Sequence, residues 1–364
     1  MKREEALQHF MDECVAVHVR RLQEKVDQQF RDNKEMLLQP IIAPLEQLFS
    51  NIKQQQAQQK LEAVAFIHFS LLRTSLLEGK CTYLLEAYGE AWYYDWVECT
   101  AQYEAAWLSE AMIDLQRALE KERKLYFVIQ AADIRAIIQK MMILFHLYII
   151  QLVRYLFRYK RESVPELDFK RAACLRFRVG EYKGFSEDVG IINERQQDES
   201  LLSWLEKKEV DKSYTFESFS HLPLQQKDFK QLDFSYAYFD GSDLTNATLQ
   251  KCVCIGTSFV DCQLMNADFS YTALQGADFR NANLTGANFT HAQGNMLKLA
   301  DGEVACSLAI DFSNANLENA KFEFAQLGDA IFTDANLKGA IFFKRDQARY
   351  QFSPEQIRVI HWLE

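Results

Sequence analysis

The sequence lacks the motifs of several well-known functional classes. It has no glycine-rich phosphate loop, no zinc-protease motif, no nucleophile elbow and no dinucleotide fingerprint. Its seven histidines are dispersed, and His18, His68 and His146 lie in helical patterns without a nearby acid in a recognised catalytic arrangement. We therefore expect no catalytic residue, no cofactor and no metal, and we interpret the chain as non-enzymatic.

Long apolar runs are also missing. The most apolar stretch, residues 141–157, is interrupted by His146, Gln151 and Arg154, and it falls short of the roughly 18 residues of a membrane span. We expect a buried core helix there and no membrane span, with membrane contact as the alternative. The charged first ten residues argue against a signal peptide, and the eight cysteines show no paired spacing. These features favour a reducing cytoplasm.

A basic excess is absent as well. The 364 residues carry a formal net charge of −10, with 30 basic against 34 acidic residues up to position 220 and 11 against 17 afterwards. Proteins that bind nucleic acids directly neutralise phosphates with clustered Lys and Arg, so we expect no direct nucleic-acid binding. The apolar content of 48% is sufficient for a core, and the length predicts two or three domains.

What the sequence does contain is a large apolar residue at every fifth position. One run holds Leu224, Phe229, Phe234, Phe239, Leu244, Leu249, Cys254, Phe259, Leu264, Phe269, Leu274, Phe279, Leu284 and Phe289, and a second holds Phe312, Leu317, Phe322, Leu327, Phe332, Leu337 and Phe342. A small residue stands two positions before most of them, often followed by Asp or Asn. A short fixed period indicates a solenoid, in which each unit buries its apolar side against the next.

Triplets such as 277–279, 287–289 and 335–337, which read Ala, then Asp or Asn, then Phe or Leu, resemble the motif of the pentapeptide-repeat proteins. The resemblance implies that four pentapeptides close one square coil and that the coils stack into a right-handed quadrilateral β-helix. Side chains four pentapeptides apart, such as Phe269 and Phe289, would then lie one above the other in the interior. The small residue would also point inward.

The predicted fold class is α+β in two parts, an all-α helical bundle followed by this β-helix. We expect an antiparallel bundle over 1–162, a mixed junction over 163–216, the repeat β-helix over 217–345 and a C-terminal helix over 346–364. Helical patterns cover 4–30, 58–78, 83–120 and 133–161, with breaks expected at Pro40 and Pro44. In the junction, Leu175, Phe177 and Val179 alternate with arginines and predict a strand, and 200–208 resembles a short helix.

The C-terminal helix is predicted from its start signal. Ser353 is a good N-cap, and Pro354 and Glu355 suit the first helical turn. The apolar residues that follow, Ile357, Ile360, Trp362 and Leu363, could cover the last coil or form a homodimer.

An insertion interrupts the repeat between Phe289 and Phe312, because the separation of these two residues is not a multiple of five, and we expect a loop over 294–309. The candidate protein-binding residues in this loop are Met296, Leu297, Lys298 and Leu299, because an ordinary surface loop needs no such apolar group. The alternative is that these residues fold back on the coil.

Two other clusters have an ordinary explanation. Cys252, Cys254 and Cys262 occupy interior repeat positions, which favours packing over a metal site. The aromatic residues Tyr88, Trp92, Tyr93, Tyr94, Trp96, Tyr103 and Trp107 are expected to form core, with a ligand groove as the alternative.

We expect a protein–protein interaction or scaffold protein, with a helical docking domain and a rigid repeat platform. We expect one or more protein partners. The resemblance also suggests a bacterial, DNA-mimicking modulator of type II topoisomerase, with DNA gyrase as the partner. A third hypothesis is a small-molecule-binding or enzymatic helical domain.

Overall fold

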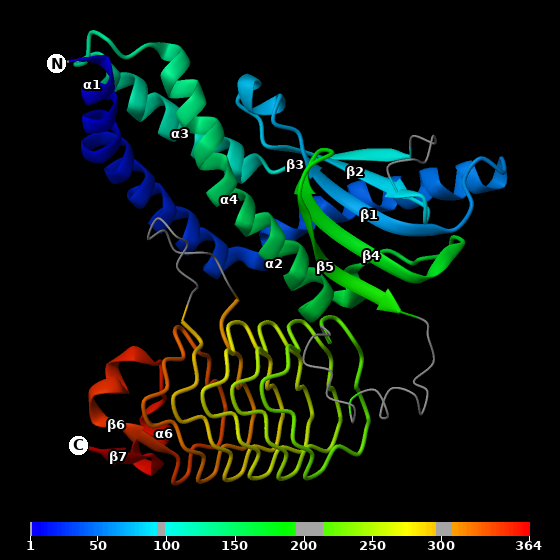
Figure 1. Ribbon diagram of the computed structural model, residues 1–364, viewed down its shortest axis with the longest axis vertical. Helices are drawn as coiled ribbons and strands as arrows, with labels where there is room; N and C mark the ends of the chain where they lie inside the picture. Colours follow the sequence, from blue (N-terminus) through cyan, green and yellow to red (C-terminus); the bar gives the residue numbers. More distant parts are fainter. Residues whose placement is uncertain (1, 93–98, 194–204, 206–213, 296–307) are drawn as a thin grey trace. The chain divides into compact units, whose positions relative to one another are not determined.

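The computed structural model describes residues 2–92, 99–193, 205, 214–295 and 308–364. The chain divides into two compact units, Met1–Arg195 and Gln196–Glu364, called here the N-terminal unit and the repeat unit (Figure 1).

The N-terminal unit combines long helices with a sheet. Its helices are α1 (Arg3–Phe10), α2 (Ala16–Ala57), α3 (Ala106–Arg123) and α4 (Ala131–Tyr159), with a π-helical stretch at Met11–Val15 and short 3-10 turns at Ser75–Glu78 and Arg161–Ser163. Its strands are β1 (Val64–Leu71), β2 (Thr82–Tyr88), β3 (Thr100–Glu104), β4 (Arg171–Glu181) and β5 (Ser186–Asn193).

The described strands form one sheet in the order β3-β2-β1-β4-β5, with β1 and β4 parallel and the other neighbours antiparallel. In the register of β1 and β4, Ile67 lies opposite Phe177 and His68 opposite Arg178. Phe177 is fully buried, and its ring packs 4.4 Å from that of Phe157 on α4. The apolar face of β4 therefore packs on α4, while the alternating arginines lie on the other face.

The prediction of an all-α N-terminal domain is wrong. Much of the predicted helix 58–78 is β1, and the predicted helix 83–120 is divided among β2, β3 and α3. Most residues of β1 are buried on both faces, so its sequence shows no alternation, and a short apolar run of this kind does not distinguish a strand from a buried helix.

The junction segment likewise contributes to the sheet. The strand predicted around Leu175 is confirmed as β4, which together with β5 completes the sheet begun by β1 much earlier in the chain. The short helix predicted at 200–208 lies outside the described residues, apart from Leu205.

Helix α2 does not end at its prolines. It continues through Pro40 and Pro44, and the residue with non-helical dihedral angles is Asn33 (φ −128°, ψ 23°). A proline inside a helix removes a hydrogen bond and costs about 3 kcal/mol. Buried residues on both sides of the prolines, including Ile41 and Leu45, keep the helix packed in the core.

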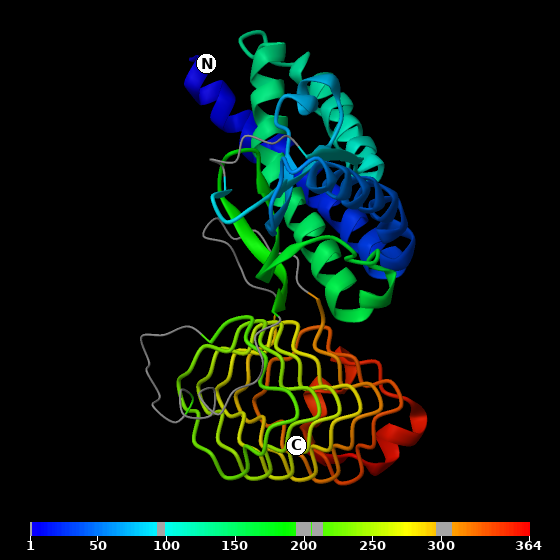
Figure 2. The ribbon, with the colours of Figure 1, turned by 90° about the vertical axis from the view of Figure 1, so that its right-hand side faces the viewer.

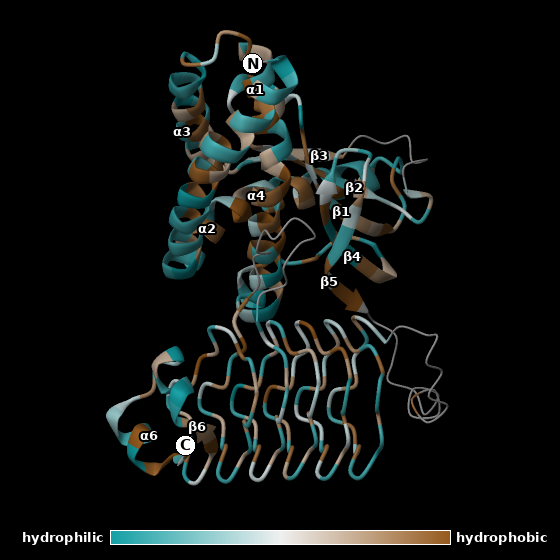
Figure 3. Ribbon diagram, turned by 60° about the vertical axis from the view of Figure 1, so that its left-hand side comes forward, coloured by the Kyte–Doolittle hydropathy of each residue, from teal (hydrophilic) through white to brown (hydrophobic). Residues whose placement is uncertain are grey.

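Among the described residues, α4 is the one helix long and apolar enough to cross a membrane. Figure 3 shows its apolar character. Most of the relevant segment is buried within the unit, including Phe145, Ile149 and Leu152. This burial agrees with the predicted core helix, because the side chains that would face lipid pack against the protein's own sheet and helices.

The repeat unit consists of stacked coils (Figures 1 and 2). Parallel bridges join residues 20 positions apart, such as Asp228 to Thr248 and Thr248 to Asp268, so each coil comprises four pentapeptides. The large and small residues of the repeat are buried as predicted. Interior phenylalanines one coil apart stack nearly parallel, with 4.9 Å between the ring centroids of Phe259 and Phe279.

The C-terminal segment begins as predicted but is less helical. Ser353 accepts a hydrogen bond from the backbone of Gln356 at the start of α6 (Pro354–Val359). The helix ends at Val359, because the residues that follow form β7 (His361–Leu363). β7 pairs in parallel with β6 (Ile341–Phe343), which is followed along the chain by the 3-10 segment Lys344–Arg349. The Nε2 of Gln356 donates to the carbonyl oxygens of Phe332 (2.7 Å) and Ala335 (3.0 Å). Ile360 joins the core of the repeat unit.

Candidate interaction surfaces

The predicted binding residues Met296, Leu297, Lys298 and Leu299 lie outside the described residues. The structure does describe where the insertion leaves and rejoins the repeat. Bridges before it, such as that from Asp268 to Asn288, span 20 positions, whereas the bridge across it from Asn288 to Lys321 spans 33 positions. The interrupted coil is therefore longer than its neighbours between Gln293 and Asp311, and it keeps its register on both sides.

The Asp or Asn of the motif stabilises the turns. The carboxylate of Asp268 accepts a hydrogen bond from the backbone N–H of Ser270 (3.0 Å), and Asn288 does the same for Thr290 (3.1 Å). Asn288 also donates to Asp268 of the preceding coil (3.0 Å). Acids and amides at this position thus satisfy backbone donors, as in an Asx turn.

The positions of the repeat that lie between the buried ones include Tyr236, Thr245, Asn246, Arg280, Asn281, Thr285, Glu318 and Lys338. Several of these interact with their neighbours. Arg280 pairs with the buried carboxylate of Asp278 (2.9 Å), and Lys338 pairs with Glu318 of the preceding coil (3.0 Å). These contacts tie turns and coils together.

A column of aromatic side chains runs across the coils at one corner. The rings of Tyr271 and His291 stack with centroids 4.7 Å apart, and those of His291 and Phe324 stack 4.9 Å apart. Phe343 meets Phe324 edge-on at 4.9 Å. Tyr271 and Phe324 remain 51% and 49% exposed. We call Tyr271, His291, Phe324 and Phe343 the aromatic ladder.

The backbone holds the ladder in place. Tyr271, His291 and Phe324 all have φ near +60°, in the left-handed region that non-glycine residues adopt infrequently. The N–H of Tyr271 donates to the next coil at Thr290 (3.1 Å), and that of His291 donates to Glu323 (3.0 Å). The turn geometry, repeated from coil to coil, therefore fixes these rings before any partner binds.

Sequence reasoning missed the ladder. The signal that could have found it is the spacing of Tyr271 and His291 by four pentapeptides at outward positions. Phe324 continues that spacing once the extra length of the insertion is removed.

The cysteines of the repeat pack in its interior, as predicted. The thiols of Cys252 and Cys262 each lie 2.9 Å from a carbonyl oxygen of the preceding coil, at Phe229 and Phe239, and both residues are buried. Burial raises the pKa of the Cys262 thiol well above its ordinary value.

The aromatic segment of the N-terminal unit is mostly core where it is described. Tyr83 and Tyr103 are buried, and burial raises the pKa of Tyr103 to about 12. The hydroxyl of Tyr83 lies 2.9 Å from Nδ1 of His146, whose pKa burial lowers to about 4. Residues 93–98, with Tyr93, Tyr94 and Trp96, lie outside the described residues.

One aromatic residue of this set does line a cavity. Trp107 contributes to a hollow of about 580 Å³ between α2 and α3. Its other lining residues are mostly polar, and include Lys25, Asp32, Glu110 and Asp114. Lys25 and Asp114 pair at 3.4 Å, and both are more than half exposed. An open polar hollow of this kind lacks the mostly apolar lining of a typical small-molecule site.

The sheet face opposite α4 carries a row of polar residues. In the strand register, Glu86, His68, Arg178 and Asp188 follow one another across β2, β1, β4 and β5. Glu86 accepts hydrogen bonds from the hydroxyls of Ser70 (2.7 Å) and Tyr88 (2.6 Å). Burial, with a smaller contribution from the positive charge of Arg178, lowers the pKa of His68 to about 3, so His68 is neutral at neutral pH.

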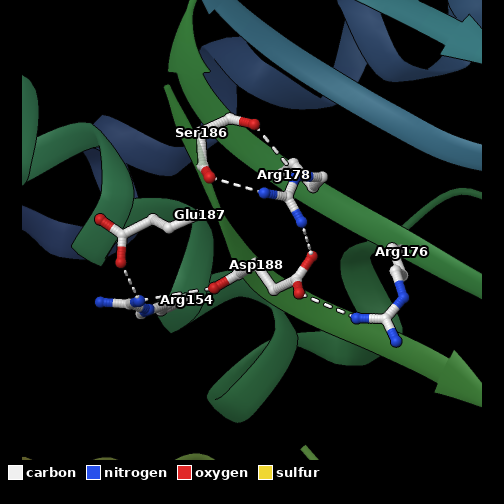
Figure 4. A network of polar contacts seen from close by, with 6 residues as sticks. All are labelled: Arg154, Arg176, Arg178, Ser186, Glu187 and Asp188. Carbon is white, nitrogen blue, oxygen red and sulfur yellow. Dashed lines mark hydrogen bonds and ion pairs between the residues drawn. The ribbon is translucent and has the colours of Figure 1, made fainter. Parts of the chain in front are cut away.

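Ion pairs extend the row, as Figure 4 shows. Asp188 binds Arg178 (2.7 Å) with one carboxylate oxygen and Arg176 (2.9 Å) with the other, and Arg178 also donates to the hydroxyl of Ser186 (3.0 Å). On the other side of β5, Arg154 pairs with Glu187 at 2.7 Å. These hydrogen bonds and ion pairs join neighbouring strands of the sheet and hold the polar side chains of the row in place.

Comparisons with solved structures return pentapeptide repeat proteins. One from the thylakoid lumen of Arabidopsis thaliana is 25% identical, with 38% of this chain and 73% of that chain covered and a TM-score of 0.23. Rfr23 from the cyanobacterium Cyanothece 51142 is 17% identical over 45% and 99% of the two chains, with a TM-score of 0.25. Full-length QnrB1, a plasmid-mediated fluoroquinolone resistance protein, is 16% identical over 41% and 91%, also with a TM-score of 0.25.

No curated protein matches the chain. Two family models do match, the Pentapeptide repeat region over residues 232–308 and Pentapeptide repeats (8 copies) over residues 310–344. The N-terminal region is unmatched. The buried five-residue pattern, the coil of four pentapeptides and these matches agree, and residues 232–344 are a pentapeptide-repeat domain.

Proposed function

We propose that this chain is a non-enzymatic interaction scaffold whose repeat unit presents a rigid binding surface to a protein partner. In this proposal the repeat unit is a right-handed quadrilateral β-helix, and the C-terminal segment with α6 and β7 caps its last coil. The hydrogen bonds from Gln356 to the carbonyls of Phe332 and Ala335 support the capping role.

The aromatic ladder carries the proposal. Aromatic side chains dominate binding energy at protein interfaces because they offer a large contact area with few rotatable bonds. Tyr271 and Phe324 leave about half of their surface exposed while their stacked rings are already ordered. A partner would therefore order few side chains on this surface when it binds, which lowers the entropic cost of association.

The test is a capture experiment with the full chain and a matched control. We expect a Tyr271→Ser/Phe324→Ser double variant to lose the bound protein that the unchanged chain captures from its native host. The control is Ile331→Ser, another exposed apolar residue of the repeat unit. Equal capture by all three proteins would contradict the proposed surface, and circular dichroism checks that the variants are folded.

The gyrase hypothesis stays a prediction, and the charge of the chain does not favour it. DNA mimicry requires strong, regularly displayed negative charge, whereas the chain carries only 17 acidic against 11 basic residues after position 220. We also propose a reducing cytoplasmic compartment, because the described cysteines carry free thiols and three of them pack inside the repeat unit.

A further inference from the structure

The connection between α3 and α4 exposes apolar side chains to solvent. Phe127 is fully exposed at 103%, Leu125 is 74% exposed and Val128 is 38% exposed. We call Leu125–Val128 the α3–α4 tip. It lies at the end of the N-terminal unit that also holds the N-terminus (Figure 1). Three apolar side chains exposed together on one short connection make it a candidate interaction site.

The tip is held in this conformation by its inward residues. The ring of Tyr126 packs edge-on against Phe10 with centroids 5.2 Å apart, and its hydroxyl lies 2.8 Å from Nδ1 of His9. The next inward residue, Ile129, is buried. Because Tyr126 and Ile129 anchor the turn on both sides, Leu125 and Phe127 are directed away from the core.

Positive charge lies beside the exposed apolar residues. The last turns of α3 place Arg117, Lys121 and Lys124 at spacings of four and three positions, which brings them to one helix face. Together with Ile113, Gln116 and Glu120 they line a surface hollow of about 400 Å³.

Two acids near the tip have cationic partners, because Glu120 pairs with Arg123 at 2.7 Å and Asp133 pairs with Arg3 at 2.8 Å. Glu13 and Glu122 lie near Tyr126, on the side of the tip that faces the start of the chain. Among the described residues, no ion pair involves Lys121 or Lys124. These two ammonium groups therefore remain available to an anion.

We propose that the α3–α4 tip docks the N-terminal unit on an anionic lipid bilayer. Leu125 and Phe127 insert among the acyl chains, and Lys121 and Lys124 contact headgroup phosphates. Reversible membrane attachment commonly needs two such signals, a small apolar insertion and a basic patch. Helix α4 does not insert, because its apolar side chains are buried in the unit.

The geometry favours a bilayer over a protein partner. A stable protein interface buries about 800 Å² on each side and needs a complementary shape. A turn with three exposed apolar side chains offers much less area, whereas a bilayer receives an inserted side chain without a preformed pocket. The proposal is independent of the aromatic ladder, so either can fail alone.

The test is co-sedimentation of the full chain with vesicles of phosphatidylcholine, with and without phosphatidylserine. We expect binding to the vesicles that contain phosphatidylserine, and a decrease in apparent affinity of at least about tenfold for Phe127→Asp. The matched control is Leu77→Asp, which changes another exposed apolar residue of the same unit. A Lys121→Gln/Lys124→Gln variant should lose the preference for phosphatidylserine, and added salt should weaken binding of the unchanged chain.

Three results would overturn the proposal. The first is no sedimentation of the unchanged chain with either vesicle. The second is an equal loss for Phe127→Asp and Leu77→Asp. The third is a chain that ignores vesicles but is dimeric by light scattering and becomes monomeric with Phe127→Asp, which would assign the tip to a second copy of the chain.

Discussion

The cores of the two units differ in how far apart along the chain their contacts lie. In the repeat unit, Phe259 stacks on Phe279, which lies one coil later in the sequence. In the N-terminal unit, Ile67 pairs with Phe177, and β2, β3, α3 and α4 lie between them in the sequence. The repeat unit is thus built from similar neighbouring layers, while the sheet forms only when distant segments meet.

This difference bears on how each unit tolerates damage. In a solenoid, stability is approximately the sum of the layers and their interfaces, so a defect is expected to stay near the coil that contains it. In a sheet with a long-range parallel pair, loss of one strand removes contacts from every other element. We therefore expect local opening in the repeat unit and cooperative unfolding in the N-terminal unit.

The largest effects on stability should come from replacing a buried phenylalanine with alanine in each core. Phe289→Ala and Phe177→Ala each remove a fully buried ring, which typically lowers the free energy of unfolding by about 3 to 5 kcal/mol. Hydrogen exchange followed by mass spectrometry should show faster exchange in the coils next to Phe289. For Phe177→Ala, exchange should increase in all the described strands of the sheet.

The control for this pair is Phe324→Ala, because that ring is half exposed and its loss should change stability by about 0.5 kcal/mol. If Phe289→Ala accelerates exchange throughout the repeat unit, its coils unfold cooperatively. The expected difference between local opening in the repeat unit and cooperative unfolding in the N-terminal unit would then be wrong.

Per pH unit a smaller effect, up to about 1.4 kcal/mol for each histidine, should separate the units in acid. Burial lowers the pKa of His68 to about 3 and that of His146 to about 4, below the ordinary value of 6.5. At a pH between the lowered and the ordinary pKa values, the unfolded chain binds protons that the folded N-terminal unit does not. The free energy of unfolding of this unit therefore falls as the pH decreases from about 6.5 towards 4. Above 6.5 the two histidines are neutral in both states and have no effect.

Hydrogen exchange of β1 and α4, corrected for the intrinsic pH dependence of exchange, measures this loss. His146→Asn should flatten the dependence, whereas His221→Gln, which changes an exposed histidine of the repeat unit, should leave it unchanged. The same pH dependence in His146→Asn and in the unchanged chain would show that other groups control it.

The repeat unit could be predicted residue by residue because its information is local. The five-residue period identified the buried positions, including Cys254 in place of a large residue, and the lost phase located the insertion. The N-terminal sheet could not be predicted in this way. β1 is buried on most of its length, and nothing near it in the sequence indicates that β4 lies beside it.

The surfaces were harder to predict than the cores. The ladder residues Tyr271, His291 and Phe324 are not periodic in the printed sequence, because the insertion lengthens the separation between the last two. Leu125 and Phe127 lie between the predicted helices 83–120 and 133–161, where apolar character alone does not distinguish an exposed residue from a core residue. Exposure, which distinguishes them, depends on how Tyr126 is anchored by His9 and Phe10 near the start of the chain.

The smallest effect on stability is expected from replacing residues 296–307 with a short Gly-Ser turn. The bridges from Asn288 to Lys321 and from Gln293 to Gln326 join the coils independently of the insertion, and Asn295, which is retained, accepts a hydrogen bond from Gly328 (3.0 Å). Shortening a loop changes its closure entropy only slightly, so the melting temperature should remain nearly unchanged.

The same variant compares two binding surfaces, because the insertion contains Met296, Leu297, Lys298 and Leu299. Capture lost with the loop but retained in the Tyr271→Ser/Phe324→Ser variant would assign binding to the loop, and the reverse would assign it to the aromatic ladder. A variant that melts well below the unchanged chain would show instead that the insertion stabilises the coils, contrary to the independence of neighbouring layers proposed for this unit.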